Sequence, residues 1–112
     1  MKESDEYAID CESQPAVAVL RGVLRLQSTE AYDRLFQVLE QKIRNSSGPY
    51  ALDLREVILM NSSGIRALAG LVLTAKAAGV PLVLRVRASV PWQRKTVSSL
   101  KLLYASLEVN ED

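Results

Sequence analysis

The middle of the chain alternates between strand-like and helix-like apolar runs, and this alternation limits the fold more than any other feature. Compact apolar runs at 50–54 and 57–60 are typical of buried strand, and residues 62–78 have the length and apolar content of a helix. Gly79 ends that helix, and the run at 81–86 is again strand-like. A strand, a helix and a strand in succession predict two parallel strands joined by a right-handed crossover.

The same alternation continues on both sides of this unit. Gly22 interrupts a long apolar stretch, which favours either a hairpin or a bent strand there. Ser28 or Thr29 is expected to cap the helix before the central unit, and Ser89 the helix after it, where Pro91 suits the first turn. The outer strands are expected at 7–11, 16–26 and 105–109, and the outer helices at 29–44 and 89–103.

These elements predict an α/β fold, with a mixed sheet of four to five strands and helices packed mainly on one face. The 112 residues suffice for one domain. We expect that domain to span residues 7–109, between a flexible N-terminus at 1–6 and a short C-terminal tail at 110–112.

Composition excludes several classes of function. The net charge is only +1, with 14 basic and 13 acidic side chains, so no basic excess favours a nucleic-acid partner. The most apolar stretch, 65–80, contains charged residues and is too short for a membrane span. The first ten residues lack the apolar segment of a secretion signal, and Cys11 has no second cysteine to pair with. We therefore expect a cytoplasmic protein with neither a nucleic-acid nor a membrane partner.

The chain also lacks the side chains of common catalytic sites. It contains no histidine, which removes histidine-based triads and the usual zinc sites, and no glycine-rich nucleotide loop is present. Trp92 is expected to be a half-buried anchor, and the cations near it a solvated face. We expect no enzyme activity and no metal or other cofactor.

The turn between the central strand and helix carries the one candidate site. Asn61 is placed to cap the helix, and Ser62 and Ser63 follow in its first turn. Gly64 allows another group to approach the backbone closely. A helix N-terminus favours negative charge, so a phosphate added to a serine here would be tolerated. The alternative interpretation is that the four residues are only a good helix cap.

A second Asn-Ser-Ser-Gly sequence serves as a comparison. It begins at Asn45 and continues through Ser46 and Ser47, after a helix rather than before one. Gly48 and Pro49 cannot continue a helix, so this copy is expected to be an ordinary loop.

The segment "YALDLREVILMNSSGIRALAGLVLTAKAAGVPLVL" resembles the core of the STAS domain, the fold of bacterial anti-sigma-factor antagonists. The family pattern is an apolar strand with an aspartate, here Asp53, followed by Asp-Ser-Ser-Gly and a helix. The resemblance covers about residues 7–109. The family usually has aspartate where this chain has Asn61. "NSSGI" together with "VPWQRKTVSSL" is similar to a cyanobacterial-type subgroup of STAS-like regulators.

The resemblance implies a non-catalytic switch. Ser62 matches the serine that is phosphorylated by a kinase with a histidine-kinase-like ATPase fold, of the anti-sigma type. A PP2C-type phosphatase would reverse the reaction. Asp53 would lie near the motif at the same edge of the sheet, or it is simply a strand-end carboxylate bound by the backbone. The partner-binding residues would be Asp53, Asn61, Ser62, Ser63, Gly64 and Ile65. The alternative is a ligand-sensing or scaffold module of the same fold, without phosphorylation.

Overall fold

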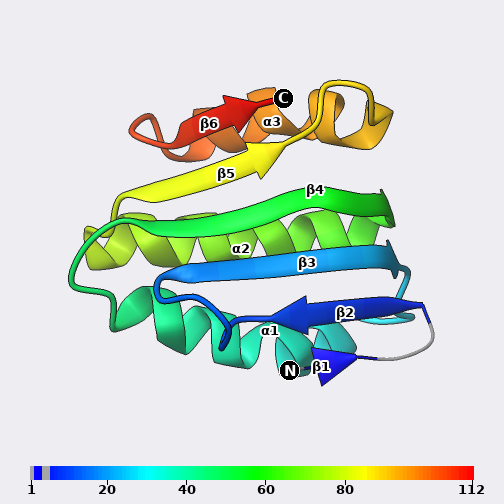
Figure 1. The fold of residues 1–112 in the computed structure, drawn as a ribbon, viewed down its shortest axis with the longest axis horizontal. Coiled ribbons are helices and arrows are strands. Elements are labelled where there is room, and N and C mark those ends of the chain that lie inside the picture. Colours follow the sequence, from blue (N-terminus) through cyan, green and yellow to red (C-terminus); the bar gives the residue numbers. More distant parts are fainter. Residues whose placement is uncertain (1, 4–5) are drawn as a thin grey trace.

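A computed structural model describes residues 2–3 and 6–112 of the chain. The elements are, in order, β1 (Lys2–Glu3), β2 (Tyr7–Asp10), β3 (Val17–Leu24), α1 (Thr29–Arg44), β4 (Tyr50–Met60), α2 (Ser62–Ala78), β5 (Leu82–Val86), α3 (Pro91–Leu103) and β6 (Glu108–Glu111). Figure 1 shows one layer of strands with all three helices behind it. No helix in this described part of the chain is long and apolar enough to cross a bilayer.

The strands lie side by side in their order along the chain, from β1 to β6. The pairs among β1, β2 and β3 are antiparallel, and each pair from β3 to β6 is parallel. Because every parallel crossover is expected to be right-handed and every step goes in the same direction, the three crossover helices must lie on the same face. The predicted α/β class and mixed sheet are therefore confirmed, with helices on one face.

The sheet has six strands where the sequence predicts four or five. The additional strand is β1, which lies inside the N-terminal segment 1–6 that was expected to be flexible. It pairs with Ala8 and Ile9 of β2. Residues 1, 4 and 5 of that segment lie outside the described residues. The expected tail at 110–112 is also wrong, since β6 extends to Glu111 and the Asp112 N–H donates to the Val86 carbonyl at 3.0 Å.

The core fills the space between the sheet and the helices. Alternate strand residues such as Leu20, Leu52 and Leu84 are fully buried there and pack against apolar residues of α1 and α2. The intervening residues, including Asp53 and Arg85, lie on the opposite face of the sheet, which no helix covers.

Strand β4 is longer than its neighbour β5, and side chains of α3 complete its hydrogen bonding. The pairing with β5 ends at Asp53. Beyond that point the buried Gln93 amide donates to the Leu54 and Val57 carbonyls at 2.7 and 3.0 Å, and the Trp92 indole donates to Val57 at 2.9 Å. These two side chains satisfy carbonyls that a neighbouring strand would otherwise bind. The anchor role expected for Trp92 is confirmed.

The two outer helices begin differently. Ser28 caps α1, its hydroxyl accepting from the Ala31 N–H at 3.2 Å, as predicted. The cap predicted for α3 is wrong: its N-cap residue is Val90, with no side-chain bond, and Pro91 occupies the first turn. Proline at the start of the helix has no N–H of its own to satisfy, and the Gln93 N–H donates to the Val90 carbonyl at 3.1 Å, so fewer donors at this helix end depend on a side-chain cap.

Candidate functional site

The candidate site lies where β4 ends and α2 begins. The Asn61 N–H donates to the Leu24 carbonyl at 3.0 Å and so continues the β3–β4 ladder by one residue. The Asn61 carbonyl accepts from the Ile65 N–H at 3.0 Å and so begins α2. One residue therefore belongs to both elements, at the carboxyl edge of the parallel strands, the edge where α/β proteins commonly bind their ligands.

The Asn61 side chain is hydrogen-bonded at both ends. Its Oδ1 accepts from the Gly64 N–H at 3.0 Å, which is the predicted cap, and from the Tyr32 hydroxyl at 2.7 Å. Its Nδ2 donates to the Leu26 carbonyl at 2.9 Å. The Tyr32 hydroxyl in turn accepts from the Leu26 N–H at 3.2 Å. Asn61, Tyr32 and Leu26 thus form a closed hydrogen-bonded triangle that joins β4, α1 and the segment after β3.

This triangle gives a physical reason for asparagine at position 61. An aspartate would keep both bonds to its oxygen, because the Gly64 and Tyr32 groups are donors. Its second oxygen would face the Leu26 carbonyl at about the 2.9 Å now spanned by a hydrogen bond. Two acceptors cannot bond, and one of them would carry negative charge. The local structure therefore favours the amide over a carboxylate, in addition to its role as a cap.

Glycine is favoured at position 64 because Tyr32 packs closely against it. A Cβ at this position would lie 2.6 Å from Met60 Cγ and 2.7 Å from the Tyr32 hydroxyl oxygen, well inside contact distance. Gly64 itself is buried. The close approach predicted for this glycine is thus an approach of Tyr32 to the first turn of α2.

Unlike Asn61, the two serines that follow it do not bond to other elements of the fold. Ser62 is exposed, Ser63 is half-buried, and Ile65 is half-buried against the core. Within the described residues, the Ser62 hydroxyl takes part in no hydrogen bond. It stands in the first turn of α2, beside N–H groups that have no partner inside the helix. The site therefore presents a free hydroxyl at the positive end of a helix.

Asp53 does not belong to this site, and the expectation that it lies near the motif is wrong. It precedes Asn61 by eight residues of extended strand, or about 25 Å at roughly 3.3 Å per residue. Its side chain lies on the uncovered face of the sheet, where Arg55 binds both carboxylate oxygens at 3.0 and 2.7 Å. Burial opposes ionisation of this carboxyl, but the bonds and charge of Arg55 outweigh it, so the pKa of Asp53 is lowered.

Two exposed apolar side chains near the motif escaped the sequence reasoning. Ile58 is 70% exposed and Leu59 is 45% exposed, three and two residues before Asn61 respectively. Their apolar character suggested a buried strand. The pairing of β4 with β3 is irregular here: Gly22 pairs with Val57, but the next residue, Val23, pairs with Leu59. Because Leu24 and its partner Met60 are buried in the core, Leu59 lies on the face of the sheet that no helix covers. Tyr32 was also missed, since its part in the site depends on a contact 29 residues away in sequence.

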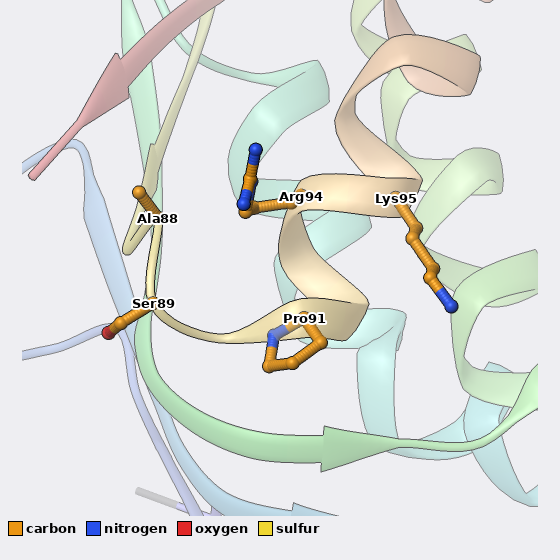
Figure 2. A pocket seen from close by; sticks show the side chains of 5 residues that line it. All are labelled: Ala88, Ser89, Pro91, Arg94 and Lys95. Atoms are coloured by element: carbon orange, nitrogen blue, oxygen red, sulfur yellow. The ribbon is translucent and has the colours of Figure 1, made fainter.

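We also considered the hollow at the start of α3 and the acidic side chains as candidate sites. A shallow hollow of about 460 Å³ at the start of α3 is lined by Ala88, Ser89, Pro91, Arg94 and Lys95. Figure 2 shows Arg94 and Lys95 extending to opposite sides of the first turn, so their charges do not converge on it. In the part of the chain that the structure describes, no group of three or more Cys, Asp or Glu side chains is arranged to hold a metal ion. Neither protein-family models nor curated proteins give a match to this chain.

Proposed function

We propose that this protein is a non-catalytic regulatory switch of the STAS type, similar to an anti-sigma-factor antagonist, in which phosphorylation of Ser62 controls binding to a partner. The observation that carries the proposal is the division of roles at the start of α2. Asn61 caps the helix and joins it to Tyr32, while Ser62 is exposed and unbonded. A modifying enzyme can therefore reach the hydroxyl without breaking any contact of the fold.

The physical effect of the modification follows from its position. A phosphate would add about 1.5 to 2 negative charges at a helix N-terminus, where such charge is tolerated. The fold would persist, and the surface that a partner contacts would change sign. A close-fitting partner would have to desolvate the phosphate, so binding would weaken.

The proposed partner is a serine kinase with a histidine-kinase-like ATPase fold, and a PP2C-type phosphatase would restore the unmodified form. The setting would be the cytoplasm, where the single cysteine, Cys11, stays reduced. Asn61, Ser62, Ser63 and Ile65 would be contacted directly. Asp53 is left out because Arg55 occupies its carboxylate far from the motif.

The test is purification of the protein with its partners from its native host, followed by mass spectrometry of tryptic peptides. The two Asn-Ser-Ser-Gly copies fall in separate peptides, residues 45–55 and 56–66, so each serves as a control for the other. We expect phosphate on Ser62 in the second peptide and none in the first, where the Ser46 hydroxyl already donates to the Gly48 carbonyl at 2.7 Å. Absence of phosphate from residues 56–66, with a partner still bound, would instead favour the scaffold.

A further inference from the structure

Arg66 lies one helical turn after Ser62, on the same side of α2. The two residues are four positions apart in this helix, and both side chains are exposed. Residues at this spacing are neighbours on one helix face, about 6 Å apart along the axis at roughly 1.5 Å per residue. Side chains in a helix lean toward its N-terminus, so the side chain of Arg66 is directed over the turn that carries Ser62.

The guanidinium of Arg66 is not used by the fold. Within the described residues, Arg66 forms no hydrogen bond and no ion pair. Other arginines are engaged: Arg44 binds Glu40 at 2.6 Å, and Arg55 binds Asp53 at 2.7 Å. An unpaired cation therefore stands one turn from the unbonded hydroxyl of Ser62, and no contact has to be broken to bring the two together.

Two acidic side chains of α1 share a small hollow with Arg66. Asp33 and Glu40 line this hollow of about 150 Å³, but neither forms an ion pair with Arg66. Glu40 is already bound to Arg44, and Asp33 is exposed to solvent. An exposed carboxylate contributes little to binding a cation, whereas a phosphate carries nearly twice the charge and binds arginine through two bonds. A phosphate on Ser62 would therefore compete successfully with Asp33 for Arg66.

We propose that Arg66 binds the phosphate on Ser62 within the same chain and holds it over the first turn of α2. This inference rests on the proposed function and adds a positioning residue to its switch. The planar guanidinium suits two parallel N–H bonds to two phosphate oxygens. An acidic group four residues before a basic one is also the more favourable of the two orders along a helix.

The bond would fix the phosphate without cancelling its charge. A doubly ionised phosphate has two negative charges, so one remains in excess after it pairs with Arg66. A partner would then meet this charge at one place on α2, where it cannot turn away, and would have to desolvate it on binding. A neighbouring positive charge also favours the doubly ionised form, so the phosphate would keep its full charge at neutral pH.

The experiment uses the full chain with phosphoserine incorporated at position 62 during synthesis, so that no kinase is required. Phosphorus NMR follows uptake of the second proton by the phosphate, which occurs at about pH 6. We expect Arg66→Gln to raise the proton affinity of the phosphate about twofold to fivefold, because a bound positive charge is removed. Arg66→Lys should restore part of the difference, because the charge remains without the planar fork. The side-chain Nε–H signal of Arg66 should shift when the phosphate is present.

The matched control removes a positive charge from the far end of the same helix. Lys76 lies in the last turn of α2, ten residues or about 15 Å beyond Arg66 at roughly 1.5 Å per residue. Lys76→Gln should therefore change the proton affinity by less than about 1.3-fold, since charges at this distance are largely screened. A second control places phosphoserine at Ser47, in the loop copy of the motif, where Arg66→Gln should have no effect.

Two results would overturn the proposal. Equal proton affinities with and without Arg66 would mean that the phosphate faces solvent alone. Equal effects of Arg66→Gln and Lys76→Gln would mean that the phosphate responds only to net charge.

The outcome for Arg66 is separate from that for the proposed switch. A phosphate on position 62 that depends on Arg66, combined with no phosphate on residues 56–66 in the host, would retain this inference and defeat the proposed function. Phosphate on Ser62 in the host, with a proton affinity that does not depend on Arg66, would do the reverse.

Discussion

Replacement of Asn61 separates its role as a helix cap from its role in the triangle with Tyr32 and Leu26. Asn61→Ala removes the cap, worth about 1 kcal/mol, and leaves the Tyr32 hydroxyl and the Leu26 carbonyl without this partner. Each lost bond costs about 1 kcal/mol, and water can reach the partly buried groups. We therefore expect a loss of about 2–3 kcal/mol in the free energy of unfolding, where a cap alone would give about 1 kcal/mol.

Asn61→Asp is the more discriminating change. The carboxylate retains the bonds from Gly64 and Tyr32, and its charge suits the helix N-terminus by about 0.3–1 kcal/mol. Against this gain, the bond to the Leu26 carbonyl is lost and two acceptors face each other, at a cost of about 2–3 kcal/mol. The net expectation is a loss of about 1–2.7 kcal/mol at neutral pH, so Asn61→Asp should be less stable than the unsubstituted protein. Protonation restores a donor, so the difference from the unsubstituted protein should shrink at acid pH.

The assay is urea unfolding followed by the fluorescence of Trp92, the single tryptophan, which is held to β4 through Val57. Ser62→Ala is the matched control and should change stability by less than about 0.5 kcal/mol, because its hydroxyl makes no bond in the fold. If Asn61→Asp proves as stable as the unsubstituted protein at neutral pH, the contact with Leu26 contributes nothing and asparagine is only a cap.

Three further predictions concern Tyr50, Asp53 and Gln93. Tyr50 is buried and its hydroxyl lacks a partner among the described residues, so Tyr50→Phe should be neutral or stabilising by up to about 1 kcal/mol in the same urea assay. The control is Tyr32→Phe, which breaks the triangle and should cost about 1–2 kcal/mol. Equal effects of the two substitutions would contradict this prediction. The pKa of Asp53 is lowered in the folded protein. Its contribution to stability is therefore fully present above the ordinary aspartate pKa near 4 and is lost as the pH falls through the lower pKa of the folded state. Asp53→Asn should flatten this part of the dependence of stability on pH, measured by thermal unfolding at a series of pH values. Gln93→Ala removes the amide from the Leu54 carbonyl and from the Arg87 N–H, while the Val57 carbonyl keeps its bond from the Trp92 indole. The substitution should cost about 2–4 kcal/mol by urea unfolding, and a cost below about 1 kcal/mol would mean that water replaces the amide.

The parts of the fold that depend on short-range physics were predictable from the sequence. The bounds of α1 and α2 follow from their caps and apolar periodicity, and α2 spans Ser62–Ala78 as expected. The placement of all helices on one face follows from strand order and crossover handedness. The error at Asp53 was avoidable, because eight residues of extended chain cannot return to the same edge of a sheet.

The site was only partly predictable, since several of its contacts join distant parts of the chain. The cap from Asn61 to Gly64 is local and was expected. The bonds from Asn61 to Tyr32 and Leu26 span 29 and 35 residues, and no pattern within one element reveals them. The exposure of Leu59 likewise depends on the irregular pairing of β4 with β3, which joins two strands far apart in the chain. An apolar run indicates that burial of its side chains is favourable, but which of those side chains are buried depends on the elements that pack beside the run.

The asparagine at position 61 also bears on how the proposed switch would work. In the aspartate form of the motif, negative charge stands beside the phosphoacceptor before any modification. Here the first turns of α2 and α3 contain no acid, so a phosphate on Ser62 would be the first negative charge in them. The local charge would change from the partial positive charge of the α2 N-terminus to a net negative one. An amide favoured for a structural reason, the bond to Leu26, would thereby leave the N-terminus of α2 without negative charge before modification, so phosphorylation of Ser62 would produce a larger change in the charge that a partner contacts than it would beside an aspartate.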